Sequence, residues 1–154
     1  MPLLPFLTAM FALLIGLTHA DRAHATSFSA PSGNIICYTV NWDYYTDKLV
    51  PPDQREMNCL VFEADWTLPP YYGDDNPNCD LDRTRAIILP PNGPAAAQWF
   101  CHGDVFWPLP NPKIAYGSDW SVSNFACTMR EDGVRCQNAS GHGFHVRRSK
   151  LTLN

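Results

Sequence analysis

Short apolar runs separated by turn residues recur along the chain after residue 33, and no segment keeps a helical period of apolar positions. β-Branched and aromatic residues dominate these runs, as is typical of strands. The runs predict strands over 34–41, 58–64, 85–90, 104–107, 113–117, 124–129, 134–138 and 143–148. Prolines recur between Pro51 and Pro112 and disfavour long helices, so residues 94–100 are the only predicted helical turn. The pattern predicts an all-β fold, a small antiparallel sandwich or barrel.

The clearest local unit is the stretch "FACTMREDGVRCQN", residues 125–138. A four-residue loop over 130–133 would use Gly133 for the positive φ that such a loop needs at its end. This loop places Met129 opposite Val134 and Cys127 opposite Cys136. Because facing residues of an antiparallel pair have Cα atoms about 4.5–5.5 Å apart, this register predicts a Cys127–Cys136 disulfide.

The first residues resemble an export signal. Residues 3–17 are apolar and uncharged, too short for a membrane span of roughly 20 residues, and small residues follow at the spacing of a cleavage site. Cleavage after Ala25 or after Ala20 fits, and Ala25 is preferred because the motif "AHA" precedes it. We expect a signal peptide over 1–25 and one secreted or periplasmic domain over 26–154, with no membrane span after cleavage.

All six cysteines follow this segment: Cys37, Cys59, Cys79, Cys101, Cys127 and Cys136. An even number in an exported chain predicts disulfides, and no Cys-x-x-Cys spacing indicates a zinc or redox motif. Proximity in the sequence adds Cys37–Cys59 and Cys79–Cys101 to the predicted pairs, without geometric support.

Charge is distributed unevenly along the chain. Residues 26–104 hold eleven Asp or Glu and four Lys or Arg, whereas residues 105–154 hold three and six. A net acidic chain is a poor candidate for nucleic-acid binding. The basic stretch "HVRRSK", residues 145–150, is interpreted as a solvated edge strand rather than a site for an anionic partner. We expect a monomer.

The stretch "SGHGFH", residues 140–145, raises the question of a metal or catalytic site. His142 and His145 could join His102 and Asp104 as zinc ligands. The preferred interpretation is a structural turn that leads into the last predicted strand, because glycines flank His142. No cofactor or metal site is therefore assigned.

A metal-dependent or hydrolytic enzyme centred on His102, Asp104 and His142 stays the alternative function. Candidate nucleophiles and a second orienting acid are Ser32, Ser118, Ser123, Ser140 and Asp119. No Gly-x-Ser-x-Gly elbow is present. The acidic residues Asp74, Asp75, Asp80 and Asp82 could serve glycoside or calcium chemistry, but they lie in a Pro/Asn/Gly-rich loop where solvated acids are common.

Aromatic residues outside the predicted strands are the stronger functional signal. Tandem or clustered rings in polar loops often contact sugars, peptides or proteins, and this set comprises Trp42, Tyr44, Tyr45, Tyr71 and Tyr72. Trp99, Trp107 and Trp120 are expected to pack in the core beside disulfides. The sequence thus favours a non-enzymatic binding module for a protein or a cell-envelope glycan, in its narrowest form an inhibitor of a lysozyme.

Four stretches together resemble a bacterial family of exported domains of unknown function: "SFSAPSGNIICY" (27–38), "CHGD" (101–104), "IAYGSDW" (114–120) and residues 125–148. The resemblance spans nearly all of residues 26–154 and implies a small, secreted, disulfide-stapled β domain without an assigned activity. His102 stands where the family pattern has glycine, and His145 also departs from it, so neither supports a shared catalytic role. The sequon at Asn138 is expected to stay unmodified in a bacterial host.

Overall fold

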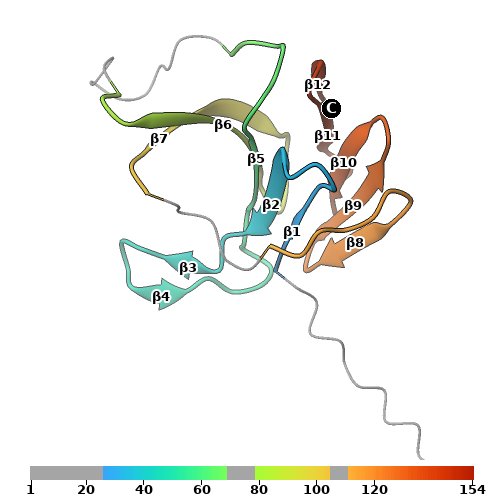
Figure 1. Cartoon of the computed structure of the whole chain (residues 1–154). Helices are drawn as coiled ribbons and strands as arrows, with labels where there is room; N and C mark the ends of the chain where they lie inside the picture. The colour runs from blue at the N-terminus through green and yellow to red at the C-terminus, as the bar shows by residue number, and fades with distance from the viewer. Residues whose placement is uncertain (1–25, 69–78, 105–110) are drawn as a thin grey trace, which may run out of the picture.

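The computed structural model describes residues 26–68, 79–104 and 111–154, which form strands, turns and loops (Figure 1). The predicted export signal lies outside these residues, as do Asp74, Asp75, Tyr71, Tyr72 and Trp107. Among the described residues, no helix has the length and apolar character needed to cross a membrane.

The first half of the chain forms one antiparallel sheet. Its strands, in spatial order, are β1 (Ser27–Ser29), β2 (Ile35–Thr39), β5 (Met57–Val61), β6 (Asp82–Leu89) and β7 (Ala96–His102). A separate two-stranded hairpin, β3 (Trp42–Asp43) and β4 (Lys48–Leu49), is inserted between β2 and β5. It projects from the end of the sheet (Figure 1).

The second half forms another antiparallel sheet in which neighbours in sequence are neighbours in space. Its strands are β8 (Asp119–Val122), β9 (Phe125–Arg130), β10 (Gly133–Asn138), β11 (Gly143–Arg147) and β12 (Lys150–Leu153). Residues on β9 and β10 alternate between buried and more exposed, as expected when one face packs on a core and the other meets solvent.

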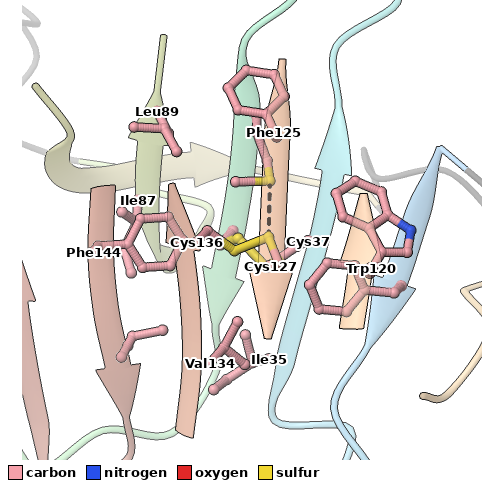
Figure 2. Packing of buried hydrophobic residues seen from close by; sticks show 14 of the residues in the cluster. Ile35, Cys37, Ile87, Leu89, Trp120, Phe125, Cys127, Val134, Cys136 and Phe144 are labelled. Atoms are coloured by element: carbon pink, nitrogen blue, oxygen red, sulfur yellow. Dashed lines mark hydrogen bonds between the residues drawn. A yellow bond between two sulfur atoms is a disulfide. The ribbon is translucent and has the colours of Figure 1, made fainter. Parts of the chain in front are cut away.

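The two sheets pack face to face around one hydrophobic core (Figure 2). Phe28, Met57 and Ile87 enter it from the first sheet, and Phe125 and Phe144 enter it from the second. All five side chains are at most 2% exposed. Because neither sheet closes on itself, the fold is a sandwich, and the all-β prediction is confirmed.

The predicted register of the second-half hairpin is confirmed. Met129 pairs with Val134, and Cys127 pairs with Cys136. The loop is shorter than predicted, because Arg130 also pairs with Gly133 and leaves a two-residue turn. Gly133 has φ +125°, so the positive value expected there is present.

All three predicted disulfides are present, and each joins segments of one sheet. Cys37–Cys59 links β2 to β5, and Cys127–Cys136 links β9 to β10, both with Cα atoms 4.1 Å apart. Cys79–Cys101 ties β7 to the segment before β6. The two sheets are therefore held together by packing and by the chain itself, without a covalent cross-link between them.

Two predicted elements are wrong. Residues 94–100 were predicted as a helical turn, but they enter β7, whose seven residues pair with β6. Cross-strand packing overrides the helix propensity of the three alanines. Residues 113–117 form no strand. Lys113 makes only an isolated bridge to Ser29, which covers the free edge of β1. Residues 105–107 of the fourth predicted strand lie outside the described part of the chain.

Candidate binding surface

The β3–β4 hairpin carries the aromatic residues that the sequence marked as a contact surface. Trp42 on β3 pairs directly with Leu49 on β4, and the Val50 amide donates to the Asn41 carbonyl at 3.0 Å. Facing residues point to the same side of an antiparallel pair, so Trp42 and Leu49 form one apolar face. They are 46% and 69% exposed.

A side-chain cap shapes the tip of this hairpin. The Asp43 Oδ1 atom accepts hydrogen bonds from the Tyr45 and Thr46 amides at 2.9 and 3.2 Å. Hydrogen bonds from Thr46 and Tyr45 favour the ionised carboxylate and lower the pKa of Asp43 below its ordinary value. Asp47 then takes φ +54°, a conformation that aspartate tolerates better than most residues. The turn is thus defined by its own sequence.

The two tyrosine rings on this turn are almost fully exposed to solvent. Tyr44 and Tyr45 are 87% and 97% exposed, and their ring centroids lie 6.1 Å apart in an edge-on arrangement. Together with Trp42 and Leu49 they form the aromatic hairpin surface, the name used below for these four residues. A small domain rarely exposes so many large apolar side chains on one short element without a use for them.

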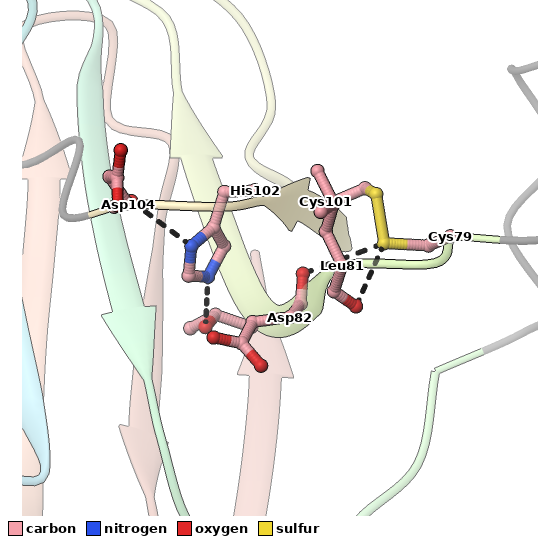
Figure 3. Close-up of a disulfide and its surroundings, with 7 residues drawn as sticks. Cys79, Leu81, Asp82, Cys101, His102 and Asp104 are labelled. Carbon is pink, nitrogen blue, oxygen red and sulfur yellow. Dashed lines mark hydrogen bonds between the residues drawn. A yellow bond between two sulfur atoms is a disulfide. The ribbon is translucent and has the colours of Figure 1, made fainter.

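The proposed metal ligands do not form a group. Within 26–68, 79–104 and 111–154, the only set of three candidate ligand atoms close together is Cys37, Cys59 and Cys136, all in disulfides. His102 lies on β7, where Nε2 contacts the Thr84 hydroxyl at 2.8 Å (Figure 3). Its Nδ1 lies 3.3 Å from the main-chain oxygen of Asp104, not from the carboxylate.

The other predicted catalytic residues are also apart from one another. His145 lies on β11, and its Nε2 contacts the Asp132 carbonyl at 2.8 Å. None of the four candidate serines is hydrogen-bonded to a histidine in the described chain: Ser32, Ser118, Ser123 and Ser140. Asp119 pairs with Arg130 instead. In the described residues, therefore, no candidate serine contacts a histidine, and no three candidate metal ligands lie together apart from the disulfide cysteines; the hydroxyl that does contact His102 is that of Thr84.

The stretch "SGHGFH" is a structural turn, as predicted, and Asn138 organises it. The Asn138 Oδ1 atom accepts from the Ser140 amide, the Ser140 hydroxyl and the His142 amide at 2.9–3.1 Å. Its Nδ2 atom donates to the carbonyls of Pro90 and Gly93 at 3.0 and 2.8 Å. Since Asn138 is 4% exposed, the atom that a glycan would modify is buried and engaged in the folded protein.

The tryptophans predicted for the core behave differently from one another. Trp120 is 9% exposed, pairs with Cys127 across β8 and β9, and packs on Phe28 with ring centroids 4.8 Å apart. Trp99 is half-buried on β7. The Arg85 guanidinium lies 4.7 Å from its ring centroid and 5.5 Å from that of Trp66. This cation between two indoles had no signal in the sequence, because its three members are far apart along the chain.

A cleft of about 440 Å³ lies where the ends of both sheets meet. Its walls come from the β1–β2 turn, the segment after β5 and the β11–β12 turn. The Asn34 side chain bonds both main-chain groups of Glu63, at 2.8 and 2.7 Å. Arg148 pairs with Glu63 at 3.1 Å and Asp65 at 3.5 Å. The charged groups at this cleft are thus already paired within the protein.

One family model matches the chain, over residues 9–154, and its description is "Family of unknown function (DUF6636)". The chain belongs to this family. No curated protein and no solved structure matches it. The description of the family assigns no activity, so the function has to be inferred from the chemistry of the surfaces.

Proposed function

We propose that this member of the family is an exported, monomeric, non-enzymatic binding module, and that the aromatic hairpin surface contacts a protein or a cell-envelope glycan. The observation that carries the proposal is the near-complete exposure of Tyr44 and Tyr45 on a turn fixed by Asp43. Rigid aromatic rings supply large contact area at low cost in conformational entropy, which suits them to recognition.

Export is supported by the apolar start of the chain and by three disulfides, which persist in oxidising compartments.

A narrower form of the proposal is inhibition of a lysozyme. Residues 26–104 carry eleven acidic and four basic side chains, and an acidic surface would attract a basic enzyme. The support is this charge and the architecture, which is common to many functions.

The experiment measures binding of the purified chain to peptidoglycan, to an isolated envelope fraction and to lysozymes. The variant Tyr44→Ser/Tyr45→Ser removes both exposed rings, and Tyr116→Ser is the matched control because Tyr116 is 51% exposed outside the hairpin. We expect the double variant to lose roughly tenfold or more in affinity, with unchanged stability, and the control to bind normally. Failure of the unchanged protein to bind any of these targets at micromolar concentration would contradict the proposal, as would normal binding by the double variant.

A further inference from the structure

The outward face of the second sheet is polar. Buried residues of β9, β10 and β11 alternate with residues that point away from the core. On β9–β12 the outward set is Ala126, Thr128, Arg130, Gly133, Arg135, Gln137, Gly143, His145, Arg147, Lys150 and Thr152. It contains no Phe, Tyr or Trp and no large aliphatic side chain, so it is unlike the aromatic hairpin surface.

This face belongs to the basic half of an acidic protein. Residues 105–154 hold six Lys or Arg against three acidic residues, whereas residues 26–104 are strongly acidic. The strands of the second sheet hold one acidic residue, Asp119, and four basic ones, Arg130, Arg135, Arg147 and Lys150. A face with a net positive charge attracts a negatively charged partner.

Three of the six cations of this half have a carboxylate partner among the described residues. Arg130 pairs with Asp119 at 3.0 Å, Arg135 with Asp132 at 2.6 Å, and Arg148 with Glu63 and Asp65. These pairs lower the charge that remains available to a ligand.

Arg147 and Lys150 are the exception among the described cations of this sheet. They face each other directly across β11 and β12, both are exposed, and neither makes a salt bridge with a described carboxylate. Like charges at directly opposed positions destabilise an antiparallel pair. A bound anion between them would turn this repulsion into two favourable contacts.

A shallow hollow of about 390 Å³ lies beside this pair. Thr128, Gln137 and Asn154 line it with hydroxyl and amide groups, and Arg135 and His145 stand at its wall. Ala126, with its short side chain, also lines the hollow. Arg147 lies two residues beyond His145 on the same strand face, about 7 Å away along the strand.

We propose that this face binds an acidic glycan. A carboxylate or sulfate group of one sugar lies between Arg147 and Lys150, and hydroxyl groups of sugars further along the glycan bond to Thr128, Gln137 and Asn154. The lack of large apolar side chains disfavours insertion into a lipid surface, and the lack of stacking rings disfavours single-stranded nucleic acid. The surface is separate from the aromatic hairpin, so either proposal can fail without the other.

The test uses polygalacturonate as the acidic glycan and dextran as the uncharged one. Lys150→Glu replaces the like-charged pair by an opposite-charged pair, so the melting temperature should stay equal or rise while affinity for polygalacturonate falls roughly tenfold or more. Lys113→Glu is the matched control, because it makes the same charge change at an exposed position outside this face. It should bind within about twofold of the unchanged protein.

Several results would overturn the inference. Equal losses in Lys150→Glu and Lys113→Glu would show a response to net charge alone. Unchanged binding by Lys150→Glu would remove the proposed anion site. Tighter binding to phosphatidylglycerol vesicles than to polygalacturonate, or equal binding to dextran, would contradict the assignment of an acidic glycan. In each case Tyr44→Ser/Tyr45→Ser reports on the hairpin separately.

Discussion

The sulfur atoms of Cys37 and Cys136 lie within 4.8 Å of each other across the core, although they belong to different disulfides and different sheets. Cys59 shares this contact, and the Met57 Sδ atom lies 3.7 Å from Cys127 Sγ (Figure 2). The centre of the sandwich is therefore packed with sulfur. Its two buried disulfides act as core side chains as well as cross-links.

The two disulfides with equal sequence separation allow these two roles to be measured apart. Cys37–Cys59 and Cys79–Cys101 both span 22 residues. The entropy that each disulfide removes from the unfolded chain therefore stabilises the fold by the same amount, roughly 3.4 kcal/mol. Replacing Cys37 and Cys59 by alanine should cost roughly 1–2 kcal/mol more, because only this pair leaves a cavity in the core. Urea unfolding of both double variants measures the difference. Equal losses would show that the core relaxes around the missing sulfurs.

Gly133 and Gly117 allow the cost of a steric overlap to be measured apart from the cost of a positive φ. A Cβ at Gly133 would overlap the Val146 carbonyl oxygen, and φ is +125° there. Gly117 has φ +88° with nothing within 4 Å of its Cβ position. Gly133→Ala should therefore cost roughly 3 kcal/mol or more, and Gly117→Ala only about 1–2 kcal/mol. Thermal unfolding compares them, and a larger loss at Gly117 would be inconsistent with the described β10–β11 contact.

Because Tyr38 is buried, we expect the protein to lose stability at alkaline pH. Burial raises the pKa of Tyr38 above its ordinary value of 10.0, while a hydrogen bond with Asn58 partly offsets the effect. A raised folded-state pKa contributes stability that is complete below pH 10 and is lost as pH rises through the folded-state value. Tyr38→Phe should cost about 1 kcal/mol at pH 7 and flatten the decline above pH 10. Tyr116→Phe, at an exposed site, is the control that should leave the decline unchanged.

Asn138 should tolerate even a near-isosteric replacement poorly. Asn138→Asp removes the two donors to Pro90 and Gly93 and places a carboxylate beside their carbonyl oxygens. We expect a loss of roughly 2–4 kcal/mol at pH 7, against about 1 kcal/mol for Ser140→Ala, which abolishes the same sequon but keeps the Asn138 amide. Denaturant unfolding decides between them. Similar losses would mean that the two carbonyls find other donors.

Much of the second sheet could be predicted because its information is local. The turn before Gly133 fixes the register that brings Cys127 opposite Cys136, and a tight hairpin leaves little freedom to its strands. β7 was missed because Ala95, Ala96 and Ala97 favour a helix in isolation, and only pairing with β6 reveals the strand.

The candidate surfaces were predictable to different degrees. The exposed rings of Tyr44 and Tyr45 follow from a polar turn sequence. The Arg147–Lys150 pair depends on the register of the last two strands, and the stretch containing it was interpreted as a solvated edge strand. That stretch instead spans a hairpin, in which a two-residue turn sets both cations on one face. The site of Arg85 between Trp66 and Trp99 depends on long-range packing, which no local pattern encodes.

The restriction of every disulfide to one sheet determines how the chain responds to a protease. A single cut between Cys101 and Cys127 leaves two fragments with no bond between them, so denaturation without any reductant separates the acidic half from the basic half. A cut between Cys37 and Cys59, between Cys79 and Cys101, or between Cys127 and Cys136 leaves the pieces tethered until thiol is added. Of these four segments, only the one between the two sheets can be cut once by a protease to give two separate products, one acidic and one basic.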